Sequence, residues 1–128
     1  MTLESLWTYE DIEAQLDHSD RYTIYLFYML LNLRARYNDG RMSISYQQLS
    51  GYYSKQRFKI TPKGIDIPKW TSIARSLRRL AYEIYPPVFY SDKRSGVFTP
   101  TDAFWIYIQE RKRKNEGYFW RLKRENRN

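Results

Sequence analysis

Cysteine is missing from the 128-residue sequence, and histidine occurs once, as His18. A chain without cysteine forms no disulfide, iron–sulfur cluster, cysteine zinc site or thiolate nucleophile. With a single histidine, neither a histidine-pair metal site nor a catalytic triad with a spare base can be built within one chain. We therefore expect no metal, no cofactor and no enzymatic activity. Carboxylates that hold Mg²⁺ and a tyrosine nucleophile are the chemistries that stay open.

Long apolar runs are also missing. The longest run, from Tyr22 to Leu31, is far shorter than the roughly 20 residues that cross a membrane. The first 20 residues contain six acids and neither Lys nor Arg, unlike the charged start of a secretory or mitochondrial signal. These absences predict an intracellular, cytoplasmic protein with no membrane partner.

Positive charge is what the chain has in excess. It contains 22 Lys and Arg against 14 Asp and Glu, for a formal net charge of +8 at pH 7. All 22 cations and eight of the acids follow residue 20, so the last 108 residues carry +14 and the first 20 carry −6. Such a basic surface favours a polyanionic partner, with nucleic acid first and an anionic membrane second. The acidic start could recruit a basic partner protein or shield the basic surface.

Length and composition predict a single domain over residues 1–128 that is mainly α with a small β component. An acidic N-terminal helix occupies residues 1–20, the central part residues 21–99, and a C-terminal helix with a basic tail residues 100–128. Capping residues, apolar spacing and breakers predict the helices. They run from Thr8 to Leu16, from a cap at Ser19 or Asp20 to Tyr37, from Tyr46 to Tyr53, from Pro68–Thr71 to Tyr85, and from Thr99 to about Arg113.

Short alternating segments predict the β component. Met42 to Ile44 is a brief strand, and Val88 to Tyr90 pairs with Gly96 to Phe98 around a basic turn. A second basic hairpin or loop is predicted from Arg57 to Ile67. The cations in and beside this loop are Lys55, Arg57, Lys59 and Lys63.

The fourth predicted helix has two different faces. Its apolar residues Ile73, Leu77, Leu80 and Ile84 share one side. At about 100° per residue, the opposite side carries Ser72, Arg75, Arg78, Arg79 and Tyr82. A solvated helix face and a surface for a polyanion both fit this pattern, and the basic hairpin that follows favours the second.

The predicted order is helix, strand, helix, a longer helix with a basic face, and a basic hairpin. From Arg21 to Thr99 this order resembles the winged helix-turn-helix family of DNA-binding domains, with Trp70 to Leu80 in the place of the recognition helix. The extra helices and the segment from Gly40 to Ser45 are similar to initiators and organisers of plasmid or phage replication. The connection from Ser54 to Ile67 departs from the family, whose turn has about three or four residues.

The resemblance implies a sequence-preferring double-stranded DNA-binding protein that acts in replication initiation or transcription regulation of a plasmid or phage. In that family the recognition helix enters the major groove, and the wing touches the backbone or the minor groove. Carried over to this chain, the recognition-helix contacts come from Lys69, Thr71, Ser72, Arg75, Arg78 and Arg79. The wing contacts come from Lys93 and Arg94.

The C-terminal part combines cations with aromatic residues. Its basic residues are Arg111, Lys112, Arg113, Lys114, Arg121, Lys123 and Arg124. Segments that track a nucleic-acid groove mix cations and aromatics in this way, as does a helix that packs its aromatics on the core. The preceding residues Phe104, Trp105, Tyr107 and Ile108 are apolar on several sides of a helix, so either the core or a second subunit covers them. A homodimer would suit a protein that reads two half-sites.

Two other functions share these features. One is a non-enzymatic protein-interaction module or mobile-element inhibitor on a winged-helix scaffold, because a fold of this kind hosts many roles. The other is binding of structured RNA. A preference for duplex DNA over single strands and RNA would distinguish the DNA-binding function from both of these alternatives.

Overall fold

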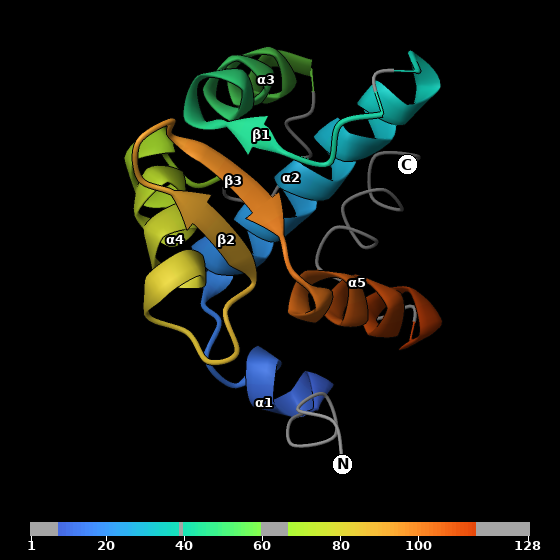
Figure 1. Cartoon of the computed structure of the whole chain (residues 1–128), viewed down its shortest axis with the longest axis vertical. Coiled ribbons are helices and arrows are strands. Elements are labelled where there is room, and N and C mark those ends of the chain that lie inside the picture. The colour runs from blue at the N-terminus through green and yellow to red at the C-terminus, as the bar shows by residue number, and fades with distance from the viewer. Residues whose placement is uncertain (1–7, 39, 60–66, 115–128) are drawn as a thin grey trace.

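The structure, a computed structural model, describes residues 8–38, 40–59 and 67–114. In this part of the chain the elements follow in the order α1 (Tyr9–Glu13), α2 (His18–Arg36), β1 (Ile44–Ser45), α3 (Tyr46–Lys59), α4 (Trp70–Tyr82), β2 (Phe89–Asp92), β3 (Val97–Pro100) and α5 (Asp102–Lys114). The fold is mainly helical with one three-stranded antiparallel sheet, so the α+β prediction is confirmed (Figure 1).

Helix α2 is the centre of the molecule. Figure 1 shows the sheet crossing in front of α2, with α4 on one side and α5 on the other. Side chains on most sides of α2 are buried, as its apolar sequence predicts. Phe27 packs its ring 4.5 Å from Phe89 and 5.7 Å from Phe104. These aromatic contacts join α2, the sheet and α5 in one core.

The sheet has the order β1-β3-β2. Strands β2 and β3 form the predicted hairpin, in which Tyr90 lies opposite Thr99 and Ser91 opposite Phe98. Strand β1 adds to the other edge of β3, with Ile44 opposite Phe98. Each strand begins one or two residues later than predicted. Alternation along β2 places Phe89 in the core and leaves Tyr90 67% exposed.

The prediction that Ser19 or Asp20 caps α2 is wrong. Asp17 is the cap, and its carboxylate accepts a hydrogen bond from the Asp20 backbone N–H at 2.8 Å. The Asp20 carboxylate in turn accepts from the Asp17 N–H at 3.1 Å. This reciprocal pair satisfies two backbone donors that a helix start leaves open.

Helix α3 is longer than predicted, and the predicted hairpin after it is wrong for the residues that the structure describes. Residues Arg57 to Lys59 are helical, and Ile67 belongs to no strand. Their alternation of basic and apolar residues fits both the helical and the strand period, and no Gly or Pro lies between Arg57 and Lys59 to end the helix. Lys55, Arg57 and Lys59 therefore lie on a helix, and Lys63 lies outside the described residues.

The remaining helix ends differ by small amounts. Helix α4 ends at Tyr82, three residues before the predicted end, although Ile84 is still buried as expected. Leu16 is likewise buried beyond the end of α1. Among the helices that the structure describes, none is long and apolar enough to pass through a membrane.

Candidate nucleic-acid interface

The exposed side of α4 carries a narrow stripe of four residues. Thr71, Arg75, Arg78 and Tyr82 follow at spacings of four, three and four, which places them in one row along a helix. All four are exposed, and the N-cap residue Lys69 is exposed beside them. On the opposite side, Ile73, Leu77 and Leu80 are fully buried, because they pack α4 onto the core. We call the exposed row the α4 stripe.

The arginines of the stripe are not neutralised by neighbours. In the part of the chain that the structure describes, no Asp or Glu forms an ion pair with Arg75 or Arg78. A guanidinium group carries five donors in a planar fork that matches phosphate oxygens and the edge of guanine. The stripe therefore presents two such groups to a partner in solution.

The basic tip of the β2–β3 hairpin lies beside α4 (Figure 1). Lys93 and Arg94 are both exposed, as predicted. The Asp92 carboxylate accepts a hydrogen bond from the Arg94 N–H at 3.0 Å, which holds the turn. Gly96 has a φ of 65°, a conformation that glycine adopts at little cost. The Lys93 ammonium lies 5.3 Å from the centre of the Tyr82 ring, so helix and hairpin meet at this point.

A groove of about 570 Å³ separates α4 from the hairpin. The start of α3 closes one end of it. The lining side chains and backbone belong to Ser45, Tyr46, Gln47, Arg78, Tyr82, Ser91, Asp92, Lys93, Ser95, Gly96 and Phe98. The groove thus contains two cations, one carboxylate, two exposed tyrosines and several hydroxyl groups.

The prediction that Arg79 faces a partner is wrong. Its guanidinium Nη2 donates to the Asp20 carboxylate at 3.1 Å and to the Gln15 carbonyl at 3.0 Å. Asp20 is fully buried, so this ion pair fixes α4 against the start of α2. The hydrogen bond from Asp20 holds the pKa of Arg79 above its ordinary value. Arg79 is a structural residue, and Ser72, on the same side of α4, is half-buried.

Aromatic contacts fix the other end of α4 against α3. The Trp70 indole N–H donates to the Tyr46 hydroxyl at 2.9 Å. Tyr53 donates to the Pro68 carbonyl at 2.7 Å, and its ring lies 5.5 Å from that of Trp70. Lys55 and Arg57 are exposed on the following turn of α3.

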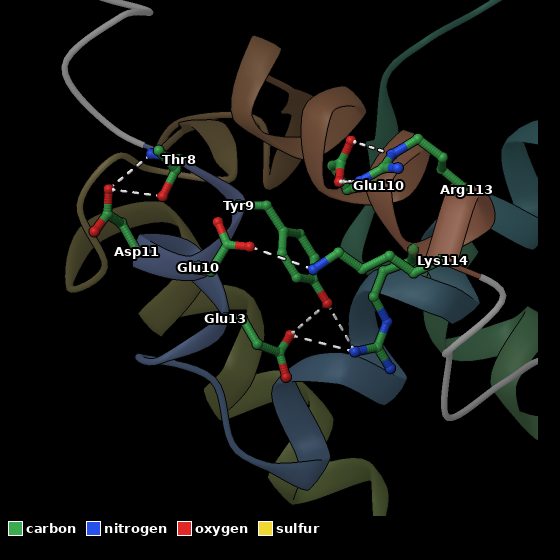
Figure 2. Close-up of polar contacts among 9 residues, drawn as sticks. Thr8, Tyr9, Glu10, Asp11, Glu13, Glu110, Arg113 and Lys114 are labelled. Atoms are coloured by element: carbon green, nitrogen blue, oxygen red, sulfur yellow. Dashed lines mark hydrogen bonds and ion pairs between the residues drawn. The ribbon is translucent and has the colours of Figure 1, made fainter.

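The basic C-terminal residues do not form a free tail where the structure describes them. Arg111 is 8% exposed, and its guanidinium donates to the Tyr9 hydroxyl at 3.0 Å and pairs with Glu13 at 3.5 Å. Burial opposes its charge, but these contacts raise the pKa of Arg111 overall. The prediction that Arg111 contacts nucleic acid is therefore wrong, because the residue holds α5 to α1 (Figure 2).

The other described cations of α5 are also engaged within the chain. Lys112 lies over the Tyr28 ring at 4.6 Å. Arg113 donates twice to Glu110 at 2.9 Å, and Lys114 contacts Glu10 at 3.3 Å (Figure 2). Arg121, Lys123 and Arg124 lie outside the described residues.

Five acids of the first 20 residues make contacts within the chain, and one of them, Asp11, accepts a hydrogen bond from the Thr8 N–H at 2.7 Å at the start of α1 (Figure 2). Glu10 and Glu13 face α5, as Figure 2 shows, while Asp17 and Asp20 cap α2. Glu13 accepts hydrogen bonds from Arg21 at 2.6 Å and from Tyr107 at 2.5 Å. Burial raises the pKa of Tyr107, and the hydrogen bond to Glu13 raises it further. These carboxylates are occupied by partners within the chain.

The residues that suggested a dimer are covered by the chain itself. Phe104 and Tyr107 are fully buried, and Ile108 is 2% exposed. Trp105 is half-buried and packs against the core, with its ring 5.0 Å from that of Phe104. The prediction of a dimer surface on α5 is wrong, because the core takes more than one face of this helix.

Tyr82 and Asp92 belong to the groove but were not predicted as site residues. Helical spacing placed Tyr82 on the side of the arginines, but the resemblance assigned it no contact. Asp92 had no such signal, because only the packing of the hairpin against α4 brings it into the groove. Among the described residues, no three acidic or histidine side chains are grouped to hold a metal ion.

Comparisons of this chain with protein-family models, with curated proteins and with solved structures give no match. The fold and the groove geometry are therefore the basis for assigning a function.

Proposed function

We propose that this protein binds double-stranded DNA with sequence preference, through the α4 stripe and the tip of the β2–β3 hairpin. The observation that carries the proposal is the pair of exposed, unneutralised arginines on α4, Arg75 and Arg78, beside a hairpin with two further cations. A rigid basic helix favours duplex DNA as the partner, because the major groove of DNA admits an α-helix and displays the base edges to it.

The order of elements supports a winged helix-turn-helix arrangement. Helices α2, α3 and α4 and strands β1, β2 and β3 occur in the order of that family, and the hairpin lies next to α4. Helix α4 would enter the major groove, and Lys93 and Arg94 would contact the backbone. Ten residues separate α3 from α4, which is longer than the family's usual turn. The aromatic contacts of Trp70 with α3 compensate, since they fix the start of α4.

A protein that finds a short duplex site and does no chemistry on it suits replication initiation or transcription regulation. In this role, affinity comes from counterion release by the cations and preference from side chains at base edges. If Arg75 and Arg78 read base edges, changing either to Ala costs about 1–3 kcal/mol at the preferred site. Selection of binding sites from a random duplex pool would supply that site.

The test is a fluorescence-anisotropy titration of labelled duplex DNA, single-stranded DNA and structured RNA at low and high salt. We expect tighter binding to duplex DNA and a steep loss of affinity with salt. The double variant R75A/R78A should lose most of this binding. The control R36A removes an exposed cation at the end of α2, which lies away from α4 in Figure 1, and should retain it.

The same titration separates the alternatives. Preference for structured RNA would replace the DNA proposal with an RNA one. No binding to any nucleic acid at low salt would overturn the proposal and favour a protein-interaction module. Equal loss in R75A/R78A and R36A would remove α4 from the interface.

A further inference from the structure

We propose that the groove between α4 and the hairpin holds one unpaired nucleotide of the bound DNA, whose base carries an exocyclic amino group. This inference rests on the proposed function, and it adds a ligand for a site that neither a helix in the major groove nor a wing on the backbone requires. The groove volume of about 570 Å³ lies within the range of about 300–1,000 Å³ that is usual for small-molecule sites.

The lining of the groove does not fit a phosphate alone. Arg78 and Lys93 suit a phosphate group, since both are cations at its edge. Asp92 lies in the same groove, and its negative charge would repel a phosphate. One Asp92 oxygen accepts from the Arg94 N–H, and the other can accept from a base. Carboxylates accept hydrogen bonds from the amino group of cytosine at base edges elsewhere.

A tyrosine ring provides the surface on which a base can stack. Tyr82 is 52% exposed and lines the groove. The Lys93 ammonium lies over this ring, 5.3 Å from its centre, so a base that takes its place on the ring would have its phosphate next to a cation. Stacking on aromatic rings is available to an unpaired base but not to a base within a duplex. Ring, cation and carboxylate together therefore favour a nucleotide over a free anion.

The chain offers a matched control for each of these groups. Tyr90 is an exposed tyrosine like Tyr82, at 67%, but it does not line the groove. Glu83 is an exposed acid next to Tyr82 in the sequence and is also outside the groove lining. Y90A and E83Q thus alter a ring and a charge near the groove without removing its contacts.

The experiment compares three labelled duplexes of one sequence: fully paired, with one unpaired cytidine, and with one unpaired thymidine. We expect the wild type to bind the cytidine duplex about tenfold more tightly than the paired duplex, in line with the contribution of one stacked base. Y82A should abolish this gain and Y90A should keep it. D92N should remove the preference for cytidine over thymidine, while E83Q should leave it unchanged.

The outcomes that overturn the proposal differ from those that overturn duplex binding. Equal affinity for the three duplexes, or a gain that is the same for both bases and unaffected by Y82A, rejects the nucleotide site and leaves duplex binding intact. If no duplex binds, the proposed function fails. An NMR titration with deoxycytidine monophosphate then decides whether the groove holds a nucleotide. Larger shifts at Tyr82 and Asp92 with this nucleotide than with inorganic phosphate support the site; equal shifts or none reject it.

Discussion

Two adjacent arginines on α4 have opposite roles. The Arg78 guanidinium is exposed at the groove, whereas Arg79 is bonded to Asp20, whose carboxylate is fully buried. Helical spacing separates neighbours by about 100°, so one residue can face solvent while the next faces the α1–α2 junction. A charge count along the sequence cannot tell them apart, because the partner of Arg79 lies 59 positions away.

Replacing each of these arginines gives different results. R79A leaves the buried Asp20 carboxylate without its cation, and we expect a loss of about 2 kcal/mol or more in the free energy of unfolding. This figure is below that of a fully buried pair because the Arg79 side chain is 32% exposed. R78A should alter stability by less than about 0.5 kcal/mol and weaken DNA binding. Urea unfolding checks the first effect, and equal stability of the two variants would contradict it.

Tyr107 makes the stability of the protein sensitive to alkaline pH. Burial raises its pKa above the ordinary value of 10.0, so the folded state keeps a proton that the unfolded state releases. The contribution of Tyr107 is therefore complete below about pH 10 and declines as the pH rises further. We expect the urea midpoint to fall between pH 9 and 11, and to fall less in Y107F. The control Y37F alters a tyrosine that is 78% exposed and should follow the wild type.

At the scale of elements, the Glu13 carboxylate is one of the groups that hold α1 and α5 together. Glu13 contacts Arg111 and the Tyr107 hydroxyl on α5, and Arg21 on α2. Deletion of residues 1–17 would remove these contacts and the buried side chains of Tyr9, Ile12 and Leu16. Such a deletion would unfold part of the core, so it cannot test whether the acidic segment shields the residues proposed to bind DNA.

A single substitution tests this connection. E13A leaves the buried Arg111 guanidinium without its carboxylate and the buried Tyr107 hydroxyl without its acceptor, and we expect a loss of about 2–3 kcal/mol in unfolding free energy. The matched control is E110A. Glu110 pairs with Arg113, whose side chain is 69% exposed, and an exposed pair of this kind contributes about 0–1 kcal/mol. If chemical denaturation gives equal losses for both variants, Glu13 does not hold α1 on α5.

The sequence predicted the elements whose signals are local. Helices α2 and α4, the hairpin and the start of α5 follow from apolar spacing, capping residues and proline, all within a few positions. The length of α3 was missed because the residues from Arg57 onward fit both helical and strand periods. The burial of Arg111 was missed because Tyr9, its hydrogen-bond partner, is 102 positions away. The Asp92 carboxylate enters the candidate site through tertiary packing, which spacing alone does not encode.

For the whole molecule, charge separation would decide the strength of the proposed DNA binding. Five cations lie on the α4 and hairpin side without an ion pair among the described residues: Lys69, Arg75, Arg78, Lys93 and Arg94. Arg79 and Arg111 instead pair with Asp20 and Glu13. The α4 and hairpin side thus holds a group of exposed cations that no described acid neutralises, which the net charge of +8 does not reveal.

This arrangement fixes the expected salt dependence. If all five cations neutralise phosphates, the logarithm of the association constant falls with the logarithm of salt with a slope of about −4.5. K93A/R94A should flatten the slope by about 2 and weaken binding to every duplex sequence alike. K112A, on α5, should leave the slope unchanged. Anisotropy titrations from 50 to 300 mM salt measure it, and equal flattening in both variants would show that binding uses the general positive charge of the molecule and not this surface.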